Sequence, residues 1–263
     1  MSEQDPRTVD LEVTVPGTPD QVWDAIATGP GISSWLHPTR VGEHVGGEFA
    51  FDMGGGYGEG GTVTAYDAPD RFATAATWPA GEETTTLATE WLVSTRDEGT
   101  CVVRMVMSGF GTGDDWDGEI DALREGMGLA LETLRVYLAH FAGRRSATVT
   151  ESARIGGSQP DVWQALLAAA GLDEARVDDH VTLRGTPELA GTVTALSPGE
   201  HLSGVVLHLD APTPGIADLA TAGGQATVHL SLFDGADGPD GPDAAAVADR
   251  ERPRWRAWLE DIR

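Results

Sequence analysis

The chain has 263 residues, a formal net charge of −25 at pH 7 and a sequence pI near 4.4. Such an acidic protein is repelled by nucleic acid and by anionic lipid surfaces, so we expect neither as a partner. No apolar run approaches the 18 residues of a membrane span, and the first seven residues are polar and acidic, unlike a secretory signal. We therefore expect a cytoplasmic protein with room for two domains of ordinary size. Cys101 is the single cysteine, which excludes a disulfide framework and a cysteine-based metal site.

Two sequence patterns occur twice and divide the chain. Residues 15–27 read V-P-G-T-P-D-Q-V-W-D-A-I-A, and residues 155–167 read I-G-G-S-Q-P-D-V-W-Q-A-L-L. The pattern G-T-V-T-A stands at 61–65 and again at 191–195. Two ordered matches at similar separations indicate a duplicated domain. We predict one domain over residues 1–142 and a second, shortened domain over residues 143–263.

The first copy is predicted to begin with a strand and a capped helix. Residues 8–15 alternate apolar and polar side chains, as a half-buried strand does. Thr18 is placed to cap a helix and Gln21 to complete a capping box, and the Gly-Pro-Gly sequence at 29–31 is predicted to end that helix. Residues 32–36 are predicted to form another helical turn.

Antiparallel strands and one long helix are predicted to complete the first copy. The strands are expected at 49–53, 62–66, 72–78, 86–93 and 101–110. The helix is expected at 119–141, where apolar residues recur at three- and four-residue steps: Ile120, Leu123, Met127, Leu131, Leu134 and Leu138. A helix of this kind after a run of strands is expected to pack across one curved sheet.

The second copy is predicted to repeat this order with one strand fewer. A strand at 148–155 and a helix at 158–171 are followed by strands near 181–183, 189–196, 202–209 and 226–233. The last helix begins near residue 244, and Pro253 is predicted to break or kink it.

The first copy resembles a known superfamily through an ordered set of motifs. These are T-P-x-x-V-W-x-A-I at 18–26, G-G-x-F-x-F at 46–51, G-T-V-x-x-x-x-x-P-x-R-F at 61–72, Trp78 and the long closing helix. Over about residues 8–141 this order resembles the START-like helix-grip (SRPBCC) superfamily, and within it the bacterial branch homologous to activators of the heat-shock chaperone ATPase. The second copy matches only at its first helix and its G-T-V-T-A strand.

The resemblance implies the fold class and a place for a ligand. We expect an α+β protein of two tandem helix-grip domains, each a curved antiparallel sheet wrapped around a long C-terminal helix. The superfamily binds or acts on lipids, polyketides and sterols in an apolar cavity between the sheet and that helix. Fold alone does not settle function, so the site residues are considered separately.

Aromatic and methionine side chains of the first copy are the candidate ligand-binding residues. Such side chains suit a flat or flexible hydrophobic ligand, although ordinary core is the alternative for each of them. The set is Trp35, Phe49, Phe51, Met53, Trp78, Trp91, Met105, Met107, Phe110 and Met127. Gly126 and Gly128 lie within the long helix, where glycine either leaves space beneath the helix or lets a strand approach closely.

Catalytic and metal-binding signatures are weak throughout the sequence. No nucleophile motif is present and no histidine has ligand spacing, so we predict no metal and no cofactor and assign no catalytic residue. An enzyme would need a polar pair in the cavity, such as His37 with Asp52 or Tyr57, although strand alternation places Asp52 on the outer side. The glycine-rich segment 54–61 is either a flap at the cavity mouth or a plain loop.

Three functions follow from these expectations. The leading one is binding of a lipid- or polyketide-like hydrophobic molecule in the first domain, with the second domain serving packing or dimerisation. The first alternative is a cyclase, dehydratase or hydrolase acting on a polyketide-like substrate. The second alternative is a module that interacts with a chaperone or another protein partner. A homodimer also stays open.

Overall fold

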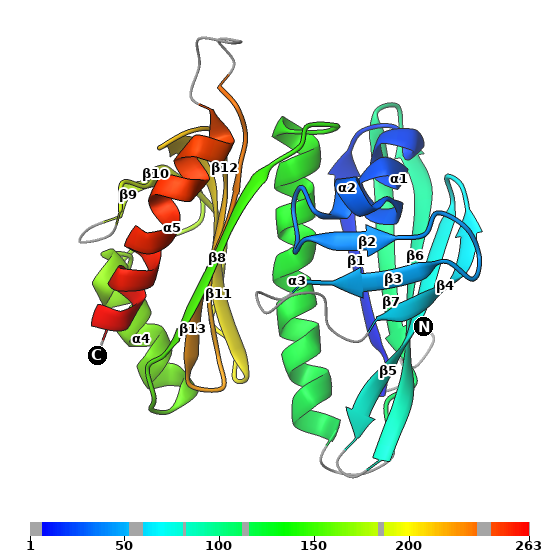
Figure 1. The fold of residues 1–263 in the computed structure, drawn as a ribbon, viewed down its shortest axis with the longest axis horizontal. Coiled ribbons are helices and arrows are strands. Elements are labelled where there is room, and N and C mark those ends of the chain that lie inside the picture. The colour runs from blue at the N-terminus through cyan, green and yellow to red at the C-terminus, as the bar shows by residue number, and fades with distance from the viewer. Residues whose placement is uncertain are drawn as a thin grey trace. The chain divides into compact units, whose positions relative to one another are not determined.

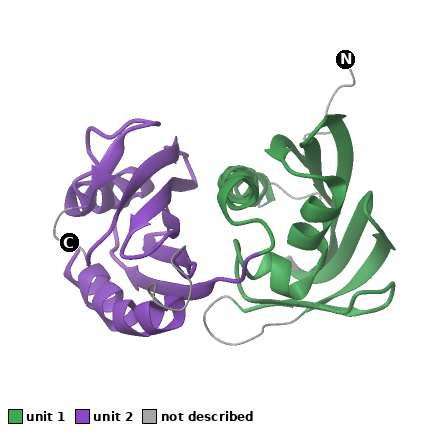
Figure 2. Ribbon diagram, turned by 90° about the horizontal axis from the view of Figure 1, so that it is seen from above, with its two compact units in different colours: residues 1–143 green, residues 144–263 purple. Residues whose placement is uncertain are grey.

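The computed structural model describes residues 7–52, 60–80, 83–111, 116–183, 187–235 and 243–262. The chain is an α+β protein that divides into two compact units, residues 1–143 and 144–263 (Figure 2). Each unit combines one antiparallel sheet with helices (Figure 1). None of the described helices has both the length and the apolar composition needed to cross a bilayer.

The first unit contains a seven-stranded sheet in the order β1-β7-β6-β5-β4-β3-β2. Its strands are β1 (Val9–Pro16), β2 (Thr39–Val41), β3 (Glu48–Phe51), β4 (Gly61–Asp67), β5 (Arg71–Ala80), β6 (Glu83–Asp97) and β7 (Thr100–Ser108). Each predicted strand is present, with ends that differ by a few residues, but β2 was not predicted. Three residues are too few to show a period, so this edge strand is defined by its pairing with β3.

Three helices accompany this sheet: α1 (Pro19–Ala27), α2 (Gly29–Ile32) and α3 (Asp117–His140). The capping box of α1 is present, because the Gln21 backbone N–H donates to Thr18 Oγ1 at 3.3 Å and the Thr18 N–H donates to Gln21 Oε1 at 2.9 Å. The prediction that residues 29–31 only end α1 is wrong. They form the first turn of α2, because Thr28 Oγ1 accepts from the Gly31 N–H at 3.0 Å and a proline is tolerated in a first turn.

Helix α3 lies along one side of the first sheet, which we call the inner face (Figure 1). Val9 and Val15 of β1 and Val103 of β7 point to this side and are fully buried. Leu134 and Leu138 in the C-terminal half of α3 are buried as well. The core of the first unit therefore lies between α3 and the inner face.

The second unit contains a six-stranded sheet in the order β8-β13-β12-β11-β10-β9. Its strands are β8 (Ala147–Arg154), β9 (His180–Thr182), β10 (Ala190–Ser197), β11 (Leu202–Ala211), β12 (Gly215–Ala222) and β13 (Gln225–Leu232). The described sheet thus has one strand fewer than the first, as predicted. Strand β12 was not predicted, because glycine, alanine and a central Asp218 give it little of the β-branched and aromatic composition typical of strands.

The helices of the second unit are α4 (Gln159–Ala170) and α5 (Ala244–Asp261). Helix α5 continues through Pro253, so the predicted break is wrong. Proline removes one helical hydrogen bond, and contacts with β8 hold the chain on both sides of it. Arg252 donates to the Thr148 carbonyl at 2.8 Å, and Arg256 donates to both carboxylate oxygens of Glu151 at 2.9 and 3.0 Å.

The repeated G-T-V-T-A sequence has the same structural role in both units. The pairing register shifts between Val63 and Ala65 in β4 and between Val193 and Ala195 in β10, so each copy contains a bulge. The leading glycine of each copy lies against the neighbouring strand. A Cβ atom added to Gly61 would lie 2.4 Å from the Ala75 carbonyl oxygen. The repeat therefore encodes a close strand approach followed by a bulge.

Alanine at the leading glycine should destabilise either unit. A Cβ atom on Gly191 would lie 2.2 Å from the His208 carbonyl oxygen, a backbone atom that cannot rotate away. We expect Gly191→Ala to lower the free energy of unfolding by about 2–3 kcal/mol, as overpacking does, measured by urea denaturation.

The matched control for this prediction is Gly128→Ala in α3. A Cβ atom added there has no neighbour within 4 Å, so the change should stabilise α3 by about 1 kcal/mol through helix propensity. If the Gly191→Ala variant were as stable as wild type, strands β10 and β11 would be able to move apart at this point without cost.

Candidate functional site

A row of cross-strand neighbours crosses the middle of the inner face, and we call it the central row. Its members lie opposite one another on five adjacent strands: Val9, Met107, Thr89, Thr74 and Val63. Since residues that lie directly opposite one another in a sheet point to the same side, all five point towards α3. The central row is the reference for locating the predicted ligand-binding residues.

The strand residues among the predicted set all belong to the inner face. The pairing register places there Phe49, Phe51, Trp78, Trp91, Met105 and Met107. Trp35 packs edge-on against Trp91 with ring centroids 6.4 Å apart, and Phe110 packs against Trp116 at 5.9 Å. Met127 lies on α3. Met53 and Tyr57 lie outside the described residues, as does most of the glycine-rich segment 54–61.

Burial separates these residues into two groups. Five are nearly inaccessible and form core: Trp35, Trp91, Met105, Met107 and Phe110. Four are half-buried and define what we call the open strip: Phe49, Phe51, Trp78 and Met127. Half-buried side chains offer a ligand more accessible surface than nearly inaccessible ones do. The open strip is therefore the part of the predicted set that is available to a ligand.

Trp78 of the open strip lies beside the start of α3. Trp78 Nε1 donates to Glu119 Oε1 at 2.6 Å and fixes the start of α3 beside the end of β5. Met127 lies eight residues beyond Glu119 in α3, a rise of about 12 Å. Thr74 lies four residues from Trp78 in β5, about 13 Å along the strand. Met127 therefore reaches the level of Thr74 in the central row. Leu123 and Met127 are only half-buried at these levels.

Beyond Met127, the inward residues of α3 are fully buried. The alternative that a strand approaches the helix does not hold at Gly128, because an added Cβ would have no neighbour within 4 Å. The contact between α3 and the inner face is therefore tight in the C-terminal half of the helix and at Ile120 near its start, and looser at Leu123 and Met127 between them.

His37 and Asp52 come together at the end of the β2–β3 pair. The Asp52 N–H donates to the Pro38 carbonyl at 2.8 Å, and His37 is half-buried on the adjoining loop. Burial lowers the pKa of His37, and the charge of Asp52 opposes this effect. The pair is adjacent to Phe51. In the described part of the chain, no group of three or more His, Cys, Asp or Glu side chains is placed to hold a metal ion.

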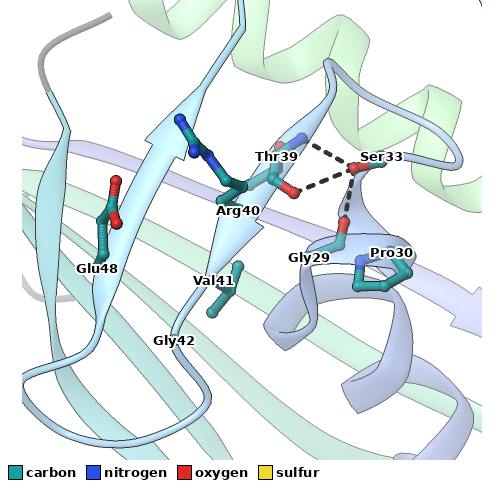
Figure 3. Close-up of a pocket in the computed structure, with 8 residues that line it drawn as sticks. All are labelled: Gly29, Pro30, Ser33, Thr39, Arg40, Val41, Gly42 and Glu48. Carbon is teal, nitrogen blue, oxygen red and sulfur yellow. Dashed lines mark hydrogen bonds between the residues drawn. The ribbon is translucent and has the colours of Figure 1, made fainter. Parts of the chain in front are cut away.

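A separate groove of about 550 Å³ lies beside α2 and the β2–β3 pair (Figure 3). It is lined by Gly29, Pro30, Ser33, Thr39, Arg40, Val41, Gly42 and Glu48, none of them a predicted site residue. Ser33 Oγ donates to the Gly29 carbonyl at 2.6 Å and accepts from the Thr39 N–H at 2.8 Å. Because Arg40 and Glu48 are exposed and polar, this groove does not suit a hydrophobic ligand.

The second unit has an equivalent row, identified through the repeated G-T-V-T-A strand. Val193 takes the place of Val63, and the row continues as Leu207, Ala217, Leu230 and Val149. All five residues are 0% exposed. In the same register Leu219 replaces Trp91, Val228 replaces Met105 and Ala211 replaces Trp78. The second unit is thus a closed aliphatic core at the level where the first unit is open.

Each unit is an antiparallel sheet packed against a C-terminal helix, which is the helix-grip arrangement expected from the sequence. The resemblance predicted for the first copy is confirmed: residues 16–139 match the family model described as "Activator of Hsp90 ATPase homolog 1-like protein". No curated protein is significantly similar to the chain in sequence.

Solved structures similar to the chain include proteins that match one unit or both. MLL2253 from Mesorhizobium loti is 21% identical over 51% of this chain and 98% of its own, with a TM-score of 0.46. The di-domain ARO/CYC protein BexL from the BE-7585A biosynthetic pathway is 15% identical over 97% of this chain and 98% of its own, with a TM-score of 0.44. DynU16, from the dynemicin biosynthetic locus, is 15% identical over 97% of both chains, with a TM-score of 0.43.

Proposed function

We propose that the first unit binds a hydrophobic small molecule, lipid- or polyketide-like, against the open strip, and that the second unit serves packing or dimerisation. The observation that carries this proposal is the difference between the two rows. The central row of the first unit contains the half-buried Thr89, whereas the whole equivalent row of the second unit is inaccessible.

The open strip offers suitable chemistry for such a ligand. Phe49 and Phe51 pack edge-on with centroids 4.8 Å apart, and Phe49 also packs against Phe72 at 6.2 Å. These two rings, Trp78 and Met127 are all half-buried and leave apolar surface accessible. Covering apolar surface contributes about 25 cal/mol per Å², so 200 Å² on each side supplies roughly 10 kcal/mol before the costs of association. An association cost of about 4 kcal/mol leaves about 6 kcal/mol, which corresponds to a dissociation constant of tens of micromolar.

Neighbouring residues of β5 provide a matched test of this proposal. Trp78 points to the inner face, and Thr77 is exposed on the opposite face. We expect the intact chain to bind the neutral fluorescent probe N-phenyl-1-naphthylamine. The Trp78→Ala variant should bind it at least tenfold more weakly, and Thr77→Ala should match wild type in the same fluorescence titration.

A further variant separates the aromatic ring from its hydrogen bond. Trp78→Phe keeps aromatic surface and loses the bond to Glu119, so it should retain most of the affinity. No binding by the wild-type chain, or equal binding by Trp78→Ala, would contradict the proposal.

The pair formed by His37 and Asp52 favours catalysis as a second candidate. A half-buried histidine with a lowered pKa is mostly neutral at pH 7, as a general base must be. In a cyclase it would remove a proton from a substrate bound over Phe51. Turnover of a poly-β-keto thioester that is lost in His37→Ala would support this role, and turnover unchanged in that variant would remove it.

A further inference from the structure

Two hydroxyl groups lie side by side in the middle of an apolar surface. Thr74 of β5 and Thr89 of β6 are direct cross-strand partners in the central row, where opposing Cβ atoms are about 5 Å apart. Their neighbours in the row are Met107 and Val63, and the next pair along the same two strands is Phe72 with Trp91. The hydroxyl pair is thus surrounded by apolar side chains of the first unit.

Neither hydroxyl forms a hydrogen bond within the described part of the chain. Thr74 is 5% exposed and Thr89 is half-buried, so the pair is mostly withdrawn from water. Neither hydroxyl oxygen is among the fully buried polar atoms without a partner in the described residues, so each still has accessible surface that a ligand could reach. Both groups retain their full capacity to donate and to accept.

The row of the second unit shows what an ordinary core has at these positions. The residues equivalent to Thr74 and Thr89 are Leu207 and Ala217, both fully buried. A helix-grip core of this chain therefore forms without hydroxyl groups at this level. Packing alone does not account for the threonine pair in the first unit.

The charges of the first sheet indicate that the partner is uncharged. Arginine occurs at four positions on its strands, and each alternates with inner-face residues and projects to the outer side: Arg40, Arg71, Arg96 and Arg104. The hydrogen bonds of these side chains agree with this orientation, since Arg71 pairs with Glu90, Arg104 with Asp10, and Arg96 donates to Thr14. An anionic group at the hydroxyl pair would therefore face no strand cation and would lose its hydration.

We propose that Thr74 and Thr89 determine the specificity of the ligand site, and that the ligand is a neutral, ring-containing hydrophobic molecule with a hydroxyl or carbonyl oxygen placed between the two threonines. This proposal rests on the proposed function of the first unit. It excludes plain hydrocarbons and fatty-acid anions as preferred ligands. It also places the polar group of the ligand in the interior, under the level of Met127, rather than at the mouth of the site.

The test compares three related probes on the intact chain. Naphthalene, 1-naphthol and 1-naphthoate share one ring system and differ in the oxygen group and charge. We expect wild type to bind 1-naphthol about three- to tenfold more tightly than naphthalene, which is the range for one neutral hydrogen bond. It should bind 1-naphthoate more weakly than 1-naphthol. Quenching of tryptophan fluorescence or isothermal titration calorimetry measures all three affinities.

Valine variants test the residues, because valine replaces the hydroxyl with a methyl group of similar size. Thr74→Val and Thr89→Val should remove the preference for 1-naphthol while naphthalene affinity stays the same or rises. Thr77→Val, on the exposed side of β5, should keep the wild-type preference. Urea denaturation of each variant establishes that it is folded.

The outcomes separate this proposal from the proposed function. Equal wild-type affinity for naphthalene and 1-naphthol, or a preference that survives both valine changes, would overturn the role of the threonines and leave hydrophobic binding standing. Tightest binding of 1-naphthoate would overturn the neutral ligand. Failure of all three probes to bind would count against both proposals.

Discussion

Trp35→Ala is expected to lower the free energy of unfolding of the first unit by about 3–5 kcal/mol, the cost typical of truncating a buried tryptophan. Trp35 is 1% exposed, packs on Trp91, and donates its Nε1–H to the Ala25 carbonyl at 2.8 Å. The change removes packing, a hydrogen bond and the contact between the α2 region and the sheet. Because a chain of two compact units need not unfold in a single transition, urea denaturation should be followed by the indole signal of Trp91 in NMR spectra.

Two controls separate the contributions to this effect. Trp35→Phe keeps most of the packing and should cost much less, because it loses chiefly the bond to Ala25. Trp78→Ala should have a smaller effect on stability than Trp35→Ala, since Trp78 is half-buried. A Trp35→Ala protein as stable as wild type would show that Trp35 is not part of the core.

Trp255→Ala is expected to destabilise the second unit by a similar amount, about 3–5 kcal/mol, whereas Trp255→Phe should be close to neutral. Trp255 of α5 is 0% exposed and packs edge-on against Trp258. Its Nε1–H is buried and has no hydrogen-bond acceptor in the described structure. Phenylalanine gives up some packing but also removes a buried donor that costs about 1–3 kcal/mol when unsatisfied.

The measurement for this prediction is urea denaturation followed by the indole signal of Trp163, which lies in the same core. If Trp255→Phe proves as harmful as Trp255→Ala, the indole N–H must have an acceptor, such as a buried water molecule. In that case the core of the second unit would contain water beside Trp255.

Elements with a strong local signal were predictable from the sequence. The capping box at Thr18, the repeated pattern at 15–27 and 155–167, and the repeated G-T-V-T-A strand each combine residue type and spacing in one short segment. They located both copies and their first helices. The inward orientation of Trp91 and Met105 also followed from strand alternation alone.

Features that depend on tertiary contacts were not predictable in this way. Strand β2 exists through its pairing with β3, and α5 passes Pro253 because Arg252 and Arg256 hold it to β8. The division of the predicted site residues into core and open strip required knowledge of burial. Thr74 and Thr89 were overlooked, since two threonines fifteen residues apart in sequence show nothing until the strand register pairs them.

The most direct test of ligand binding in the first unit uses the indole N–H signals of the intact chain. The eight tryptophans comprise five in the first unit and three in the second: Trp23, Trp35, Trp78, Trp91 and Trp116, then Trp163, Trp255 and Trp258. In spectra of ¹⁵N-tryptophan-labelled protein titrated with 1-naphthol, we expect the Trp78 signal to shift most and the three signals of the second unit to stay in place. Shifts confined to Trp163, Trp255 and Trp258 would contradict a ligand site in the first unit.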